Sequence, residues 1–572
     1  MGTTQSTLEK HGYVLQKTTE NAVVATKGDD TYLIKQIKLD QTSTNPALIP
    51  EIELLMNTSH PHIVSLKNSF KDEDQNVYYI VMDICQGGNL AAKIREMSDS
   101  PQESEVLSWI AEICVALKTI HEKGILHKCL TPENVLLTEI GTVCLGGFGN
   151  IHENSTKTPV STNSQQTINY LPPEAFTEGT YDAKSDIWSV GCILYELYTR
   201  EPAFFAETTL QLIPKIISGH YPSRPENFSS ELWGILKEIF SKDPQSRPTA
   251  NEILKRPIMI HCLSEKCKTT VKELQTMVDK LRDVADSLER VHQGATIGSL
   301  TGGVIGAVGG ITSVVGLILA PFTLGASLIV TGVGIGVGAA GGVAAGASSI
   351  TNMVNQSSDC KAVRSIIKKI EQKVNSVVCW QQEISYILEE IMSRCDSADT
   401  TSNEVSELNQ GNLVAGCMRT GKGLGGIAEL VRLVQVTNIG KVAAQGARAV
   451  RVAEVASGVL SGLLLAVDIF FIAMDAKEIH HIRQAKAARE REGTPSGPVS
   501  KTDTIDSDLA ELVSDRSKVQ DQTSTIRSEI MKFAHSIRQA ADDLQKNVEE
   551  LRCINVMFPS PEELNQLRER SH

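Results

Sequence analysis

The sequence predicts a multidomain protein in which an α+β region is followed by an all-α region. Its 572 residues are 41% hydrophobic and 22% charged, which supplies enough apolar material for several cores and excludes global disorder. Short β-like segments occur only in the first half of the chain. Beyond them, helical periodicities alternate with apolar stretches rich in glycine and alanine. We therefore place the domain boundary between Pro257 and Lys268.

Composition excludes several classes of protein. The 55 basic and 68 acidic residues give a net charge of −13, so no nucleic-acid partner held by phosphate contacts is expected. The 12 cysteines are scattered without a CxxC pair, which indicates reduced thiols and a cytoplasmic protein. The first residues lack the apolar segment of a cleaved signal peptide, so secretion by that route is not expected.

The first half contains recognisable strands and helices. Residues 32–37 and 77–82 are rich in aromatic and β-branched side chains and are predicted to be strands. Residues 103–123 place apolar side chains at helical spacing, and a second buried helix is expected around Trp188 and Leu197.

Several short motifs then follow one another in a fixed order. They are Tyr32-Leu-Ile-Lys35, His60-Pro-His-Ile-Val64, Ile80-Val-Met-Asp-Ile-Cys-Gln-Gly-Gly88, His127-Lys-Cys-Leu-Thr-Pro-Glu-Asn134, Gly147-Phe-Gly149, Pro172-Pro-Glu174, Ser185-Asp-Ile-Trp-Ser189 and Arg247-Pro248. In this order the motifs resemble a Ser/Thr protein kinase domain, and among such domains the NIMA-related family. The resemblance covers residues 10–263 and implies a two-lobed α+β kinase-like fold.

The resemblance also implies roles for individual residues. Lys35 matches the strand lysine that holds the phosphates of ATP, and Glu51 is its expected helix partner. Asn134 matches the metal ligand of the catalytic loop. Two open alternatives remain for Lys35 and Glu51: weak ATP binding, or a purely structural pair with no nucleotide.

Three positions depart from the kinase pattern. Cys129 replaces the catalytic-loop aspartate, and Thr131 replaces the lysine expected two positions later. Gly147 replaces the metal-binding aspartate, so no carboxylate is available there for Mg²⁺. Loss of a general base alone costs about 10²–10⁴-fold in rate. The sequence therefore predicts a pseudokinase with weak or no ATP binding, and it argues against a Mg²⁺ site.

Other features of this region bear on phosphate binding or on the stability of the fold. The loop that covers the phosphates in kinases is rich in glycine, whereas residues 18–24 contain none. Glu174 and Arg247 match a buried ion pair of the family, and Asp186 matches the residue that anchors the catalytic loop. The alternative function for this region is a residually active Ser/Thr kinase that uses Lys35 and Asn134.

The second half carries an uncharged segment. No Asp, Glu, Lys or Arg occurs between Arg290 and Asp359. Two apolar stretches within 295–347 each approach the ~20 residues that cross a bilayer, which predicts a hydrophobic helical hairpin. Glycines at four-residue spacing let two helices approach closely in lipid; they include Gly302, Gly306, Gly310, Gly332 and Gly336. Whether the hairpin spans, inserts conditionally or stays buried in a soluble bundle is open.

A further apolar segment, 455–474, contains a carboxylate at mid-span. A charge at the centre of a bilayer is costly, so Asp468 is either functional or opposes stable insertion. One alternative is that Asp468 becomes neutral at low pH and eases insertion. The other is an aspartate at the edge of a soluble helix pair.

Amphipathic helices surround these segments. Apolar stripes are expected over 271–291 and 363–391, and an unbroken heptad pattern over 504–555 with polar positions at Arg516, Thr523 and Asn547. Residues 489–503 are predicted to be a linker and 556–572 a tail. An intermolecular coiled coil and an intramolecular helix pair are both open for the heptad helix.

This half resembles the apolipoprotein L family, with a domain expected over residues 268–488. The matching residues are Leu281–His292, Leu319–Gly325, Leu464–Phe471 and Asp475. The resemblance implies lipid binding and membrane association.

The N-terminus adds a second membrane signal. Residues 1–9 are predicted to be a tail in which Gly2 fits the pattern for N-myristoylation. One acyl chain binds membranes only marginally, so the hairpin would supply the second anchor. The sequence thus predicts a membrane-associated pseudokinase regulator on intracellular membranes or the inner face of the plasma membrane. Its partners would be lipid, and proteins bound through the kinase-like surface or the heptad helix. The alternative is a soluble coiled-coil scaffold.

Overall fold

The computed structural model divides into two compact units. Unit 1 contains Met1–Cys267, Cys379–Gly446 and Met557–His572, and unit 2 contains Lys268–Val378 and Ala447–Val556. The structure describes residues 2–19, 22–28, 30–39, 48–74, 76–98, 101–148, 165–219, 222–225, 228–298, 345–399, 445–492, 504–560 and 563.

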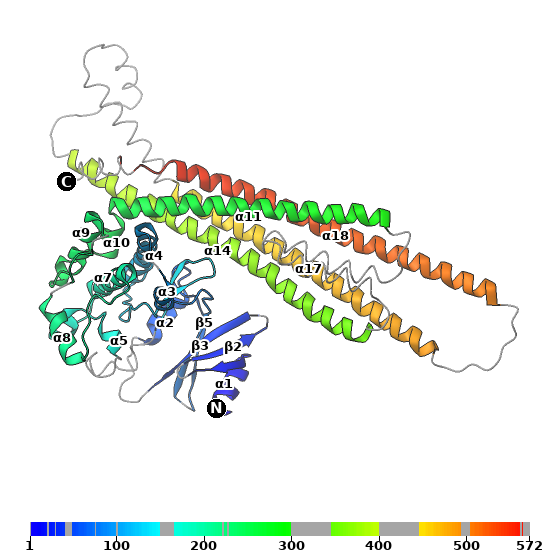
Figure 1. Ribbon diagram of the computed structural model, residues 1–572, viewed down its shortest axis with the longest axis horizontal. Coiled ribbons are helices and arrows are strands. Elements are labelled where there is room, and N and C mark those ends of the chain that lie inside the picture. The colour runs from blue at the N-terminus through cyan, green and yellow to red at the C-terminus, as the bar shows by residue number, and fades with distance from the viewer. Residues whose placement is uncertain are drawn as a thin grey trace, which may run out of the picture. The chain divides into compact units, whose positions relative to one another are not determined.

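Unit 1 opens with a five-stranded antiparallel sheet in the order β1-β2-β3-β5-β4 (Figure 1). The strands are β1 (Val14–Thr18), β2 (Ala22–Lys27), β3 (Asp30–Lys38), β4 (Leu66–Asp72) and β5 (Val77–Asp83). The predicted strands 32–37 and 77–82 are confirmed as the middle of β3 and β5, which pair with each other. Alternate apolar residues of β2, β3 and β5 form one buried cluster. Helix α2 (Leu48–Met56) follows β3 and carries Glu51.

The prediction of a tail over residues 1–9 is wrong. Residues Gly2–Lys10 form helix α1. Leu8 is fully buried in the cluster of the sheet, and Thr7 Oγ1 donates a hydrogen bond to Asp72 Oδ2 at 2.5 Å. One buried leucine and one buried hydroxyl attach this helix to the sheet, so it is a structural part of unit 1.

A mainly helical lobe completes the kinase-like part of unit 1. Its helices are α3 (Leu90–Glu96), α4 (Glu103–Glu122), α5 (Gln165–Ile168), α6 (Pro173–Thr177), α7 (Ala183–Thr199), α8 (Thr209–Ser218), α9 (Ser230–Ile239), η3 (Pro244–Ser246) and α10 (Ala250–Leu254). Strands β6 (Val135–Leu137) and β7 (Val143–Leu145) form a separate hairpin. The predicted helices at 103–123 and around Trp188 are confirmed as α4 and α7. Both bury most of their side chains, so the lobe is built around them.

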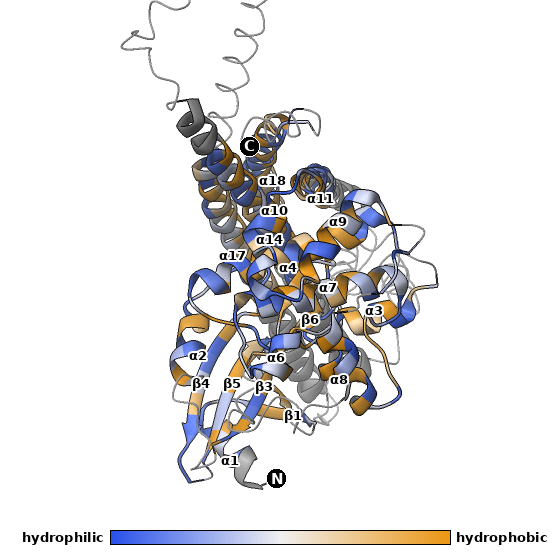
Figure 2. Ribbon diagram, turned by 90° about the vertical axis from the view of Figure 1, so that its left-hand side faces the viewer, coloured by the Kyte–Doolittle hydropathy of each residue, from blue (hydrophilic) through white to orange (hydrophobic). Residues whose placement is uncertain are grey.

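In the described residues that follow, the long helices are α11 (Pro257–Gly298), α14 (Ala345–Asp399), α17 (Gly446–Glu492) and α18 (Thr504–Val556). The α+β lobes followed by an all-α region confirm the predicted fold class. The described parts of the long helices carry both hydrophobic and hydrophilic residues (Figure 2). In unit 2 the predicted stripes are buried, for example Leu274 of α11 and Ile367 of α14. Because α17 continues to Glu492, the predicted linker cannot begin at 489.

The described part of the heptad seam packs against its own chain. Phe533 of α18 stacks on Phe470 of α17 with ring centroids 4.4 Å apart. Arg282 Nη2 of α11 lies 3.1 Å from Asp542 Oδ1 of α18. Asn547 is buried within the seam. These contacts agree with an intramolecular helix pair.

Among the described residues, one helical segment, Gly446–Ala473 of α17, is long and apolar enough to cross a membrane by length and composition. Within unit 2, Asp468 Oδ1 accepts hydrogen bonds from Arg364 Nη2 at 2.7 Å and Nε at 3.0 Å. This pair corresponds to the soluble alternative for Asp468. Leu465, Ile469 and Ile472 of the same helix are 60%, 55% and 67% exposed. The predicted glycines Gly302, Gly306, Gly310, Gly332 and Gly336 lie outside the described residues.

Candidate functional site

Lys35 lies in the middle of β3, where the sheet fixes its backbone. Lys35 is the β-sheet partner of Ile80 in β5. Its Nζ donates a hydrogen bond to the carbonyl oxygen of Phe148 at 3.3 Å. Glu51 of α2 has its Oε1 4.0 Å from Lys128 Nζ. The pairing of Lys35 with Glu51 stays a prediction. The structure places Lys35 next to the segment that follows β7.

The connection between β1 and β2 is short. The backbone N–H and the hydroxyl of Thr19 both bond the carbonyl oxygen of Ala22 at 2.8 Å. These bonds join the end of β1 to the start of β2. Residues 18–24 contain no glycine, whereas a glycine-rich loop is what lets the backbone of a kinase approach phosphates.

The catalytic-loop segment is anchored by one buried carboxylate. Asp186, at the start of α7, accepts the backbone N–H groups of His127 and Lys128, each at 2.9 Å. It also bonds His121 Nε2 at 2.8 Å and the Tyr181 hydroxyl at 2.7 Å. These bonds lower the pKa of Asp186 despite its burial, which acts in the opposite direction. The anchoring role expected of Asp186 is therefore present in the geometry.

Cys129, Asn134 and Gly147 meet at the centre of the site. Asn134 Nδ2 donates to the Cys129 carbonyl at 2.7 Å and lies 3.3 Å from Cys129 Sγ. Gly147 has a φ of +77°, and a Cβ built there would lie 2.5 Å from both Cγ and Oδ1 of Asn134. The Asn134 side chain thus fills the space that a side chain at position 147 would need. Thr131 is buried beside this loop and offers no charge.

His127 links the loop to the segment after β7. Its Nε2 is 2.9 Å from the Gly146 carbonyl, and its ring lies 5.2 Å from that of Phe148. Burial lowers the pKa of His127, so the ring is neutral and Nε2 carries the donated proton. A neutral buried imidazole with a backbone partner holds position and is not a replacement for the missing carboxylate.

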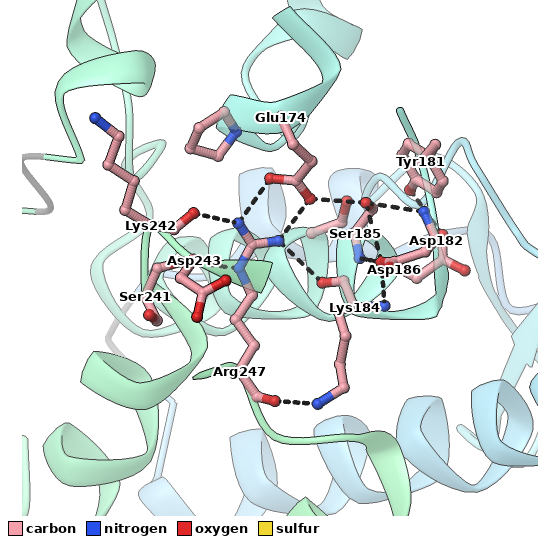
Figure 3. A network of polar contacts seen from close by, with 12 residues as sticks. Glu174, Tyr181, Asp182, Lys184, Ser185, Asp186, Ser241, Lys242, Asp243 and Arg247 are labelled. Atoms are coloured by element: carbon pink, nitrogen blue, oxygen red, sulfur yellow. Dashed lines mark hydrogen bonds and ion pairs between the residues drawn. The ribbon is translucent and has the colours of Figure 1, made fainter. Parts of the chain in front are cut away.

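A second network stabilises the lobe away from the cleft (Figure 3). Arg247 Nη1 and Nη2 each lie 2.7 Å from an oxygen of Glu174, forming a bidentate pair. Ser185 Oγ also donates to Glu174 at 2.7 Å, and the guanidinium lies 4.9 Å from the centre of the Trp188 ring. Arg247 and Glu174 are both buried. This pair supports the fold, as the sequence predicted.

The donor set around Gly147 does not fit Mg²⁺. Mg²⁺ requires carboxylate or similar oxygen ligands in near-octahedral geometry. Cys129 provides a thiol, Gly147 provides no side chain, and the amide of Asn134 bonds the Cys129 backbone. Within the described residues, no group of three His, Cys, Asp or Glu side chains is arranged to hold a metal ion. We therefore derive no step through a metal at this site.

Comparison with known proteins agrees with the two kinds of fold in this chain. The protein kinase domain family matches residues 19–259, and the apolipoprotein L family matches residues 265–492. The chain thus joins a protein kinase domain with NIMA-related homologues to a region that matches the apolipoprotein L family. Similar proteins include the serine/threonine-protein kinase Nek1 of Mus musculus, 38% identical over 237 residues, covering 41% of this chain and 20% of Nek1. Nek4 of Mus musculus is 33% identical over 273 residues, covering 46% and 34%. Nek3 of Mus musculus is 35% identical over 246 residues, covering 42% and 48%.

The NIMA-related domain of this chain spans less than half the length of each of these three relatives. All three relatives are named serine/threonine-protein kinases of the Nek type, and this supports assigning residues 19–259 to a kinase family whose members in general bind ATP. The sequence alone showed no sign of one further feature of this domain. Trp380 lies 318 residues beyond His62, yet its Nε1 bonds His62 Nε2 at 2.8 Å within unit 1. No local sequence motif predicts a contact between residues so far apart in the chain.

Proposed function

We propose that the protein is a membrane-associated regulator whose kinase-like domain transfers no phosphate. The observation that carries this proposal is the geometry at Gly147. The position lacks the metal-binding carboxylate, and the side chain of Asn134 fills the adjacent space. Cys129 supplies a thiol where a general base is needed, and preorganised charge at the metal position is absent as well.

Phosphate transfer tests this proposal directly. The full chain is incubated with γ-labelled ATP, Mg²⁺ and a general kinase substrate, beside the Lys35→Ala variant and mouse Nek1 as a positive control. We expect no incorporation above that of Lys35→Ala. Incorporation by the unmodified chain that disappears in Lys35→Ala contradicts the proposal and supports the residually active kinase.

Nucleotide binding without catalysis is part of the proposal. Lys35 Nζ lies near the carbonyl of Phe148 and remains on the strand that faces the cleft in kinases. We expect weak ATP binding that does not depend on Mg²⁺, because the metal ligands are missing. A thermal shift measured with ATP, with and without Mg²⁺, follows RT ln(1 + [L]/Kd). A large shift that requires Mg²⁺ contradicts this expectation.

For the second half, we propose lipid binding at intracellular membranes or the inner face of the plasma membrane. Support comes from the apolipoprotein L match over residues 265–492 and from the apolar length of α17. Asp468 is held by Arg364 in a soluble arrangement, so entry into lipid requires that pair to separate. Flotation of the full chain with anionic liposomes at pH 7 and pH 5 is the test. Protein that stays in the dense fraction at both pH values supports the soluble scaffold.

N-terminal acylation is the second membrane signal we propose. Gly2 is the first residue of α1. Co-expression with an N-myristoyltransferase and an alkyne-labelled myristate should label the wild type but not Gly2→Ala. Lys10→Gln, which alters the same helix outside the pattern of residues 1–6, serves as the matched control and should be labelled like the wild type. Equal labelling of wild type and Gly2→Ala contradicts the assignment.

A further inference from the structure

Residues 379–391 of α14 pack against the NIMA-related domain within unit 1. From Cys379 onward the helix belongs to unit 1, whereas residues up to Val378 belong to unit 2. Trp380 is 1% exposed, and Ile384, Ile387 and Leu388 are fully buried. One continuous helix therefore has its apolar face in the core of the NIMA-related domain and continues into the apolipoprotein L domain.

Trp380 is the anchor of this packing. Its Nε1 donates to His62 Nε2 at 2.8 Å, and the two rings stack with centroids 6.0 Å apart. His62 Nδ1 lies 2.9 Å from the Val143 carbonyl. Burial lowers the pKa of His62 to about 3, so the ring is neutral. Only one tautomer satisfies both contacts: Nδ1 donates to Val143 and Nε2 accepts from Trp380.

The backbone around His62 is also hydrogen-bonded directly to β7. The Leu145 N–H donates to the His62 carbonyl at 2.8 Å, and the Val64 N–H donates to the Leu145 carbonyl at 2.9 Å. The Val143 N–H donates to Glu112 Oε2 at 2.8 Å. Strand β7 ends two residues before Gly147. A short series of hydrogen bonds thus runs from Trp380 through His62 to the end of β7, two residues before the position where kinase chemistry would require a carboxylate.

Two charged pairs hold the helix on the C-terminal side of Trp380. Lys118 Nζ of α4 lies 2.7 and 2.9 Å from the two oxygens of Glu383, and 3.9 Å from the centre of the Tyr386 ring. Lys255 pairs with Glu390. The side chains of Lys118 and Glu383 are only 10% and 12% exposed, so this ion pair is largely removed from water.

Lys266 is a third lysine that contacts the groups around Trp380. Lys266 pairs with the fully buried Glu112, and its Nζ lies 5.0 Å from the centre of the Trp380 ring. Glu112 therefore connects Lys266 to β7 through Val143. Helices α4, α11 and α14 all contribute to a single buried polar cluster around His62.

We propose that residues 379–391 are a built-in regulatory helix. By holding His62 and β7, they let the state of the apolipoprotein L domain set the conformation of the nucleotide cleft near Gly147. A packed hydrogen-bond series with one discrete anchor is the kind of element through which two sites become coupled. Only the identity of the signal, lipid binding, rests on the proposed function.

The anchor is tested by hydrogen exchange in the full chain. Trp380→Phe keeps an aromatic ring but leaves the buried His62 Nε2 without its donor. We expect the amides of Val64, Val143 and Leu145 to exchange about tenfold faster, a factor that corresponds to about 1.4 kcal/mol. The matched control is Trp233→Phe on α9. Equal exchange in the two variants overturns the proposal.

Two further variants separate the ion pair from general surface effects. Glu383→Gln removes the charge that pairs with Lys118. Glu389→Gln makes the same change at an exposed position of the helix. We expect a few-fold faster exchange at Val143 and Leu145 only in Glu383→Gln. No difference between the glutamine variants contradicts the proposed hold of this helix on the domain.

The relay is tested with vesicles of phosphatidylcholine and phosphatidylserine. In protein that floats with these vesicles, we expect exchange at Val143 and Leu145 to change several-fold, and Trp380→Phe to abolish the change. An unchanged wild type, or the same response in Trp380→Phe, overturns the relay. Protein that does not float contradicts lipid binding instead, so failure of the proposed function is distinguished from failure of the anchor.

Discussion

Replacing Gly147 by alanine tests whether Asn134 fills the space of the missing carboxylate. Gly147 has a φ of +77°, and a Cβ added there would lie 2.5 Å from the Asn134 side chain. Gly141, in the turn between β6 and β7, provides a matched control. Its φ is +75°, and an added Cβ there would meet nothing within 4 Å.

Both variants place a side chain on a residue with positive φ, and only Gly147→Ala also creates a clash with a neighbouring side chain. A non-glycine residue in the left-handed region costs about 1–2 kcal/mol, so Gly141→Ala should lose about that much stability. Gly147→Ala must in addition displace Asn134. Forcing that side chain off its rotamer costs about 0.5–1.5 kcal/mol, and losing its bond to the Cys129 carbonyl about 1 kcal/mol. We expect Gly147→Ala to be about 1.5–2.5 kcal/mol less stable than Gly141→Ala.

Tryptophan fluorescence measures this difference in the full chain. The four tryptophans, Trp109, Trp188, Trp233 and Trp380, all lie in unit 1. Urea unfolding followed by their emission therefore reports unit 1 alone, and a change in midpoint at constant slope is a change in stability. Equal midpoints for the two alanine variants would refute the reasoning. Adding Asn134→Ala to Gly147→Ala should recover part of the difference.

Three further predictions use the same fluorescence assay or a close relative of it. Glu174→Gln should destabilise unit 1 by about 3–5 kcal/mol, because it leaves buried Arg247 without its charge partner; a loss below about 1 kcal/mol contradicts this. Asp468→Asn should cost at most about 1 kcal/mol in thermal unfolding followed by circular dichroism, because its pair with Arg364 is about one third exposed. Lowering the pH from 7 to 5 should destabilise wild-type unit 1 by about 2 kcal/mol more than His62→Asn.

The sign of the pH effect follows from which state binds the proton. Burial lowers the pKa of His62 to about 3, whereas an unfolded histidine titrates near about 6.5. The stability contributed by the neutral ring is present above about pH 6.5 and is lost as the pH falls toward 3. At pH 5 the difference is about 1.5 units of 1.36 kcal/mol each.

Neighbouring groups also titrate in this range. His60 has its pKa lowered to about 3 by burial and acts in the same direction as His62. Burial raises the pKa of Glu112, which opposes the effect because a protonated buried carboxyl favours the folded state. Both are present in wild type and in His62→Asn, so the comparison reports His62 together with its own contribution to the lowered pKa of His60. An identical loss of stability in the two proteins contradicts the assignment.

Local periodicity made much of unit 1 predictable. Strands β3 and β5 follow from alternating β-branched and aromatic residues, and α4 from apolar residues at helical spacing. The anchoring of the catalytic loop by Asp186 followed from motif order, because the residues that meet there come from fixed places in a known fold. The stripes of the long helices were equally readable, since each is a regular pattern within one helix.

The remaining features depend on contacts that no local pattern contains. Residues 1–9 form a short and mostly polar segment, so a helix there is not stable by itself. Burial of Leu8 against the sheet stabilises α1. Trp380 lies on a stripe that predicts an amphipathic helix, yet the stripe does not indicate which surface it covers. The exchange of partners along α14, from unit 2 to unit 1, is likewise a tertiary property.

The pattern of retained and lost kinase residues has a physical explanation. Asp186, Glu174 and Arg247 are buried and bonded to several partners, so removing any of them leaves an uncompensated polar group in the core. Positions 129 and 147 border the cleft and are only partly buried. A carboxylate there serves metal and substrate, and its replacement by a thiol or a hydrogen atom leaves no buried charge unpaired. A kinase fold can therefore carry other residues at these two positions while its lobes stay intact.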